Sequence, residues 1–147
     1  MACDLCNLLA EVKLNSGAAL IWGDDRLSVV AVDEAEYPGY TRVVWNAHVK
    51  EMTDLPAADR SRVMDVVWAV EAAQREILAP EKINLASFGN MTPHVHWHVI
   101  PRYRDDAHFP NPTWAVAQRA SSAEVLAARR ALLPALHAAI VEKVKAL

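Results

Sequence analysis

Three histidines alternate with apolar residues in segment 94–100, which reads His-Val-His-Trp-His-Val-Ile. Side chains along a β-strand point alternately to its two faces, so His94, His96 and His98 share one face. Neighbouring imidazoles are then roughly 6.5–7 Å apart, and the outer two are roughly 13 Å apart. Because zinc–nitrogen bonds are about 2.0–2.1 Å long, a single metal ion cannot bind all three histidines of a straight strand.

A row of imidazoles is better suited to an extended substrate that carries several negative charges. One histidine can attack such a substrate while its neighbours donate hydrogen bonds to phosphate oxygens or to the leaving group. The unperturbed imidazole pKa near 6.5 makes both protonation states accessible at neutral pH. A single strand histidine is usually a surface or core residue, but three alternating ones beside a Gly89-Asn90 turn favour a reactive site.

The apolar pattern predicts the elements that position this strand. Two apolar runs with residues 23–26 between them predict a β-hairpin, and Pro38-Gly39 predicts a turn. The predicted strands are residues 18–22, 27–32, 41–45, 83–88 and 95–100, and the predicted main helices are about 56–78 and 121–146. This order indicates one α+β domain, residues 1–147, with a five-stranded antiparallel sheet.

Charge and composition limit the kinds of partner. The formal net charge is -3 and no basic stripe is visible, which argues against a general nucleic-acid binder but not against a small anionic ligand. The N-terminal residues have neither a basic stretch nor a long apolar run, and no run of 18 apolar residues occurs. We therefore expect a soluble cytoplasmic protein that does not span a membrane. Its only cysteines, Cys3 and Cys6, have a C-x-x-C spacing that is typical of redox or metal-binding pairs.

Segment 94–100 resembles the signature of the histidine triad (HIT) family, His-φ-His-φ-His-φ-φ with φ apolar, at every position. The resemblance covers about residues 3–103 and includes Pro38-Gly39, Asp33 and the C-x-x-C pair. Members of this family bind nucleoside phosphates, dinucleoside polyphosphates or nucleoside phosphoramidates. They cleave at the α-phosphorus through a covalent nucleotidyl-histidine. The resemblance therefore implies a hydrolase or nucleotidyl transferase for a purine nucleotide, working without a required cofactor. It also implies a homodimer that pairs the 56–78 helix and a sheet edge.

The resemblance also implies a role for each candidate residue. His96 would be the nucleophile, His98 would assist the leaving group, and His94 would orient the attacked phosphate. The turn at Gly89 and Asn90 would hold phosphate oxygens. The carboxylate of Asp33 would accept hydrogen bonds from the ribose hydroxyls.

Two positions depart from the family pattern. Asn90 stands where glutamine is usual, which shortens one phosphate donor by a methylene. Tyr40 stands where many members have a fourth histidine that supports the triad. A phenol forms hydrogen bonds but does not titrate near neutral pH. The main rival hypothesis is therefore a non-catalytic nucleotide-binding or sensing module.

The resemblance implies a possible structural zinc as well, since some bacterial members bind the metal with the first triad histidine. Here the ligands would be Cys3, Cys6, His48 and His94, a sound set for tetrahedral zinc. Reduced cysteines without a metal are the alternative. A second rival hypothesis makes this zinc site the important one.

Three residues after the triad have more than one interpretation. Arg102 and Arg104 would contact substrate phosphates or end a solvated strand. His108 is expected on the surface. Trp114 would shield the pocket, pack at a dimer interface or, most simply, pack in the core.

Overall fold

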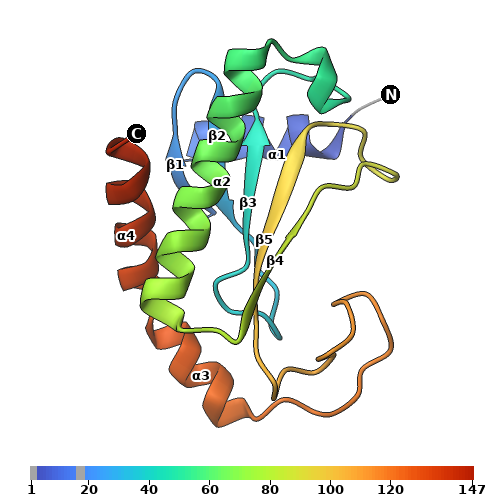
Figure 1. Cartoon of the computed structure of the whole chain (residues 1–147), viewed down its shortest axis with the longest axis vertical. Coiled ribbons are helices and arrows are strands. Elements are labelled where there is room, and N and C mark those ends of the chain that lie inside the picture. Colours follow the sequence, from blue (N-terminus) through green and yellow to red (C-terminus); the bar gives the residue numbers. More distant parts are fainter. Residues whose placement is uncertain (1–2, 16–18) are drawn as a thin grey trace.

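The computed structural model describes residues 3–15 and 19–147. Ala18, where the first predicted strand begins, lies outside the described residues. The elements are α1 (Asp4–Asn15), β1 (Leu20–Gly23), β2 (Leu27–Ala31), β3 (Thr41–Trp45), a 3-10 turn (Met52–Asp54), α2 (Ala57–Leu78), β4 (Lys82–Ala86), β5 (His96–Arg102), α3 (Ala123–Ala131) and α4 (Leu133–Lys145). Figure 1 shows α2 and α4 side by side along the sheet.

The five strands form one sheet in the order β1-β2-β3-β5-β4, and every neighbouring pair is antiparallel. The predicted five-stranded antiparallel sheet is therefore confirmed. Arg42 on β3 pairs with His98 on β5, and Val44 pairs with His96. This register puts the side chains of Arg42 and His98 beside each other on one face.

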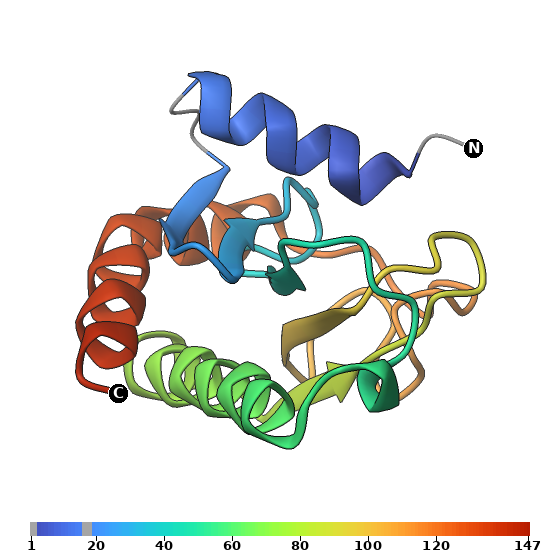
Figure 2. The ribbon, with the colours of Figure 1, turned by 90° about the horizontal axis from the view of Figure 1, so that it is seen from above.

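The two faces of the sheet are covered differently, as Figure 2 shows. The main core lies between one face and helices α2 and α4, and it includes Val43, Val99, Val66 and Ile140. On the other face, Leu5 and Leu9 of α1 pack on Val30 and Val44. The residues of β5 that point to the α1 side, His96 and His98, are not part of that small cluster. Helix α1 nevertheless comes close to His96, since Asp4, Leu5 and Leu8 line a cavity together with this histidine.

The structure corrects the helix prediction in two places. Helix α1 was not predicted, and it contains Cys6 and begins directly after Cys3. The predicted single helix 121–146 is two helices, which meet at Leu132. Pro134 in the first turn of α4 explains the break, because its nitrogen has no hydrogen for the preceding helix and its ring crowds the carbonyl four residues earlier.

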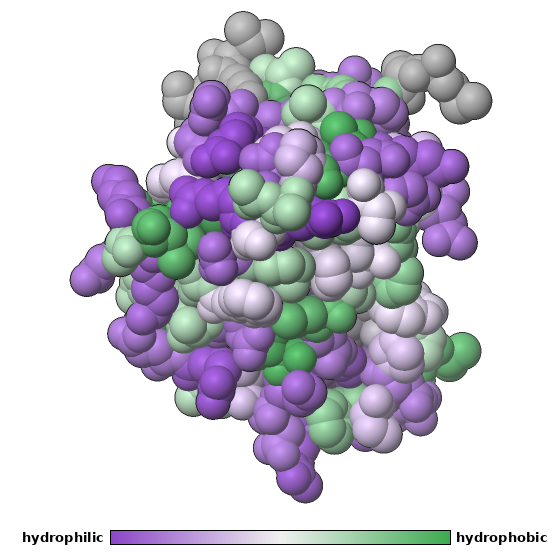
Figure 3. Space-filling view, turned by 45° about the horizontal axis from the view of Figure 1, so that its top comes forward, coloured by the Kyte–Doolittle hydropathy of each residue, from purple (hydrophilic) through white to green (hydrophobic). Residues whose placement is uncertain are grey.

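Strand β5 also runs two residues further than predicted, through Pro101 to Arg102. Its pairing with β3 ends at Val99, so Pro101 lies where β5 has β4 as its one neighbour. A missing N–H is tolerated there. Within the described residues, no helix is both long enough and apolar enough to cross a membrane. Figure 3 shows hydrophilic side chains over much of the surface, with smaller hydrophobic areas between them.

Candidate active site

The loop before β3 brings Tyr40 to the histidine strand. Gly39 has a φ of +92°, and a Cβ at this position would lie 2.6 Å from Leu78 Cδ1. Glycine is therefore required here both by the backbone conformation and by the close approach of α2. The turn predicted at Pro38-Gly39 is confirmed, and it places Tyr40 directly before β3.

His94 points away from the other two histidines of the triad. Its ring is 1% exposed, and its Nε2 lies 2.6 Å from the carbonyl oxygen of Trp45. Because a carbonyl oxygen can only accept, Nε2 carries the hydrogen and Nδ1 keeps its lone pair. That Nδ1 lies 3.4 Å from Cys3 Sγ and 3.5 Å from Cys6 Sγ. His94 therefore has no free ring nitrogen for the phosphate contact that the resemblance implies.

His96 has the opposite arrangement of its two nitrogens. Its Nδ1 lies 2.6 Å from the carbonyl oxygen of His94, so Nδ1 donates its hydrogen and Nε2 keeps the lone pair. Burial lowers the pKa of His96, the hydrogen bond to the His94 carbonyl opposes this, and the nearby Arg42 cation lowers the pKa further. At neutral pH the imidazole is therefore uncharged, with a nucleophilic nitrogen on its cavity side.

His98 lies next to His96, with ring centroids 4.9 Å apart. Its Nδ1 forms a short hydrogen bond with the hydroxyl of Tyr40. Burial, then His96, then the Arg42 cation lower the pKa of His98 to about 4. Burial also raises the pKa of Tyr40, so both partners of this hydrogen bond are neutral at pH 7. Tyr40 fixes the orientation of His98 without a titration of its own near neutral pH.

A cavity of about 570 Å³ opens in front of His96 and His98. Its other lining residues are Arg42, Phe88, Gly89, Asn90, Met91, Thr92 and Trp114. The structure thus brings Gly89 and Asn90 to the same cavity as His96 and His98. Gly89 has a φ of +130°, a conformation that favours glycine in this turn. A second cavity of about 280 Å³ adjoins the first and is lined by Asp4, Leu5, Leu8, Arg42, Thr92 and His96.

The residues that line the cavity differ in part from those that the sequence predicts. Asp33 is exposed in the loop after β2 and lines neither of these two cavities. Arg42 and Phe88 do line the larger cavity, although the sequence analysis did not select them. Tyr40 and Arg42 are two residues apart, so an extended chain places both side chains on one face. This spacing is the sequence signal that could have identified Arg42 as a site residue. Trp114 is 65% exposed and packs edge to face on Phe88, so it borders the cavity and the core interpretation is wrong.

Cys3, Cys6, His48 and His94 form a second cluster beside the triad. One ligand atom from each lies within 4.8 Å of all the others, and Cys6 Sγ is 3.5 Å from His48 Nδ1. Tetrahedral bonds of about 2.3 Å to sulfur and about 2.0–2.1 Å to nitrogen place sulfur and nitrogen ligands about 3.5 Å apart. The cluster therefore fits zinc in donor type and in spacing.

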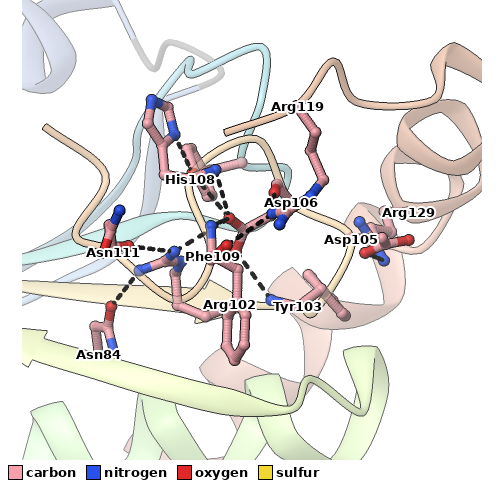
Figure 4. A network of polar contacts seen from close by, with 11 residues as sticks. Asn84, Arg102, Tyr103, Asp105, Asp106, His108, Phe109, Asn111, Arg119 and Arg129 are labelled. Atoms are coloured by element: carbon pink, nitrogen blue, oxygen red, sulfur yellow. Dashed lines mark hydrogen bonds and ion pairs between the residues drawn. The ribbon is translucent and has the colours of Figure 1, made fainter. Parts of the chain in front are cut away.

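A buried ion pair anchors the loop that follows β5 (Figure 4). Arg102 and Asp106 are 3% and 1% exposed, and their Nε and Oδ2 atoms are 2.8 Å apart. Arg102 also donates to Asn84 Oδ1 and to the Asn111 carbonyl. His108 Nδ1 lies 2.5 Å from the Tyr37 hydroxyl. Both interpretations of Arg102 are therefore wrong, because it neither ends a solvated strand nor lines the cavity. His108 is partly buried in the same network, and Arg104 pairs with Glu81 on the surface.

Comparisons with known proteins identify the family. The model of the HIT domain matches residues 13–105, more than half of the chain, and the chain therefore belongs to the HIT family. A search of curated proteins gave no significant match. Among solved structures, a histidine triad protein from Bradyrhizobium japonicum is 26% identical, with a TM-score of 0.68 over 90% of this chain and 94% of that chain.

Two further structures share the fold at lower identity. A histidine triad protein from Marinobacter aquaeolei is 23% identical, with a TM-score of 0.68 over 95% of this chain and 99% of that chain. A zinc-bound histidine triad family protein from Mycobacterium smegmatis is 21% identical, with a TM-score of 0.65 over 97% of each chain. Family membership supports a nucleotide-binding or hydrolase-type function in general terms.

Proposed function

We propose that the chain is a hydrolase or nucleotidyl transferase that cleaves a purine nucleotide derivative at its α-phosphate through a covalent nucleotidyl-His96. One observation carries this proposal. His96 donates from Nδ1 to the His94 carbonyl, which leaves the lone pair of Nε2 free beside a cavity of about 570 Å³. A neutral, oriented imidazole is the form that attacks phosphorus.

The reaction would have two steps. In the first, His96 Nε2 forms a bond to the α-phosphorus, and the bond from phosphorus to the leaving group breaks with its electron pair on that group. Donors near Asn90 and the imidazole of His98 stabilise the charge on the phosphate oxygens and the leaving group. In the second step, water adds to phosphorus, and the phosphorus–nitrogen bond breaks with its electron pair returning to His96 Nε2. The proton lost by water passes to the solvent and balances the proton that the leaving group takes up. Another acceptor in place of water would make the reaction a nucleotidyl transfer.

Two substrate classes fit this chemistry: dinucleoside polyphosphates such as diadenosine tetraphosphate, and nucleoside phosphoramidates. They share the nucleotide half and differ in the leaving group. The exposed Phe88 and Trp114 border the cavity and offer aromatic surface to a leaving group. Bases stack readily on such side chains.

A zinc ion held by Cys3, Cys6, His48 and His94 would supply a structural crosslink rather than reactive chemistry. The neutral Nδ1 of His94 faces the sulfur atoms and is suited to be a ligand. The crosslink would tie the start of α1 to the segment that precedes β5. His94 also supplies the carbonyl that orients His96, so the metal would hold the nucleophile in place indirectly. Metal analysis of the purified protein tests this, and a fully folded metal-free protein contradicts it.

The second candidate is a nucleotide-binding or sensing module, which Tyr40 in place of the fourth histidine favours. The hydrogen bond from Tyr40 to His98 argues for the enzyme, because the phenol does orient the imidazole. Tight AMP binding without turnover would select the sensor.

The deciding experiment follows AMP release from diadenosine tetraphosphate and from an adenosine phosphoramidate. We expect turnover by the native protein and none by His96→Ala, while the faster substrate identifies the class. His137→Gln on α4, beyond the opposite face of the sheet, is the matched control and keeps full activity. AMP binding without release from either compound would contradict the proposal.

We also propose a homodimer in the cytoplasm, with α2 and a sheet edge at the interface. Trp68 on α2 is 55% exposed and would be covered there. The molar mass in solution, measured by light scattering, tests the dimer.

A further inference from the structure

Arg42 occupies the one position of β3 that faces His98 directly. The strand register pairs their Cα atoms, so the two side chains leave the sheet together on the α1 side. The guanidinium carbon lies over the Tyr40 ring, 5.8 Å from its centroid, and the hydroxyl of the same ring forms a hydrogen bond with His98. The permanently charged guanidinium of Arg42 therefore lies near the neutral rings of Tyr40, His96 and His98.

The same residue lies at the junction of the two cavities. Arg42, Thr92 and His96 line both the cavity of about 570 Å³ and the cavity of about 280 Å³. A substrate that extends through both spaces has to pass His96 and Arg42 together. Asp4, across the smaller cavity, is exposed and forms no ion pair with Arg42 in the described part of the chain.

Arg42 is half-buried and forms no ion pair within residues 3–15 and 19–147. Its Nε is buried and has no hydrogen-bond partner within residues 3–15 and 19–147. Arg102 shows the usual arrangement in this chain, since its three guanidinium nitrogens bond to Asp106, Asn84 and Asn111. Leaving a buried donor unpaired is costly. The charge of Arg42 is thus left without a countercharge in the described part of the chain, next to the two cavities that it lines together with His96.

We propose that Arg42 binds the non-bridging oxygens of the phosphate that His96 attacks. This inference rests on the proposed function, and it adds a cationic residue to the triad. A planar guanidinium offers paired donors that match phosphate oxygens, and it never loses its charge. Beside His96 it would neutralise the charge that builds on these oxygens as the nucleophile bonds to phosphorus.

Calorimetric binding of AMP, adenosine and inorganic pyrophosphate tests the inference without turnover. We expect Arg42→Gln to lower the affinities for AMP and pyrophosphate about 10- to 100-fold. This is the effect of losing one or two charge-assisted hydrogen bonds. Adenosine binding stays unchanged, and Arg42→Lys keeps part of the affinity for the anions. Arg75→Gln is the matched control, since Arg75 is exposed on α2, beyond the other face of the sheet. Its affinities should equal those of the native protein.

Three results would overturn the inference. They are equal AMP affinity in the native protein and Arg42→Gln, an equal loss for adenosine and AMP, or no binding of either anion to the native protein. An equal loss would place the guanidinium against the base. Turnover separates this inference from the proposed function. If AMP binding depends on Arg42 but the native protein releases no AMP, the hydrolase proposal fails and the phosphate contact stands.

Discussion

Replacing Asp106 by asparagine should destabilise the protein strongly, because it leaves the buried Arg102 without its countercharge. The carboxylate is 1% exposed and accepts two hydrogen bonds from that guanidinium. Breaking such a buried pair costs about 3–5 kcal/mol. For a chain of this length the loss corresponds to a fall in melting temperature of about 6–20 °C.

The pH dependence of stability gives a second measure of the same pair. Burial opposes ionisation of Asp106, but hydrogen bonds from Arg102 and from three backbone N–H groups hold its pKa at about 2, below the ordinary value of an aspartate. A depressed carboxyl pKa stabilises the fold above the unfolded value, and that contribution disappears as the pH falls from about 4 to about 2. This lowering of the Asp106 pKa corresponds to about 2 kcal/mol in the free energy of unfolding. Asp106→Asn should lack this part of the acid dependence.

Thermal unfolding followed by circular dichroism at pH 7 and at acid pH measures both effects. Asp105→Asn is the matched control, since the neighbouring carboxylate is 56% exposed and pairs with Arg129 on the surface. An exposed pair contributes at most about 1 kcal/mol. Equal losses of stability for the two variants would contradict a stabilising role for the buried pair of Arg102 and Asp106. Because Asp106 anchors the loop that carries Trp114, Asp106→Asn should also weaken nucleotide binding.

Further predictions concern the site. Tyr40→Phe removes a neutral hydrogen bond to His98 worth about 0.5–1.5 kcal/mol, and kcat should fall about 2- to 12-fold; a loss as large as that of His98→Ala would mean that Tyr40 does more than orient the ring. Because the pKa of His98 is about 4, its protonation should lower kcat/KM as the pH falls through about 4, and a pH–rate profile with a limb near 6.5 would contradict this. Removing metal with a chelator should lower both the melting temperature and kcat/KM, and Cys6→Ser should lower both in the same way; two unchanged values would leave no role for zinc. Gly39→Ala should cost about 1–3 kcal/mol in a chemical denaturation curve, since φ is +92° and Leu78 blocks the new methyl group.

The sheet and the histidine strand were predictable because their signals are local. Alternation in segment 94–100 identifies the strand, and it places His96 and His98 on one face. Helix α1 was not predicted, although Leu5, Leu9 and Val12 recur at helical intervals and are buried.

The residues that sequence reasoning missed depend on long-range geometry. Arg42 enters the site through the pairing of β3 with β5, a register that no local pattern specifies. The different direction of His94 was equally hidden, because it depends on the Trp45 carbonyl and on where α1 places Cys3 and Cys6. The sequence also did not show that the loop after β5 folds back and places Asp106 against Arg102, where a solvated strand end was one expectation.

The covalent intermediate on His96 is the most direct test of the account. The native protein would be mixed with an adenosine phosphoramidate, quenched within a single turnover, digested, and analysed by mass spectrometry for an adenylylated peptide. A covalent mechanism through nucleotidyl-His96 predicts AMP attached to His96, and no adduct in His96→Ala. AMP release with no adduct at any time of quenching, or an adduct on His94 or His98 instead, would contradict it.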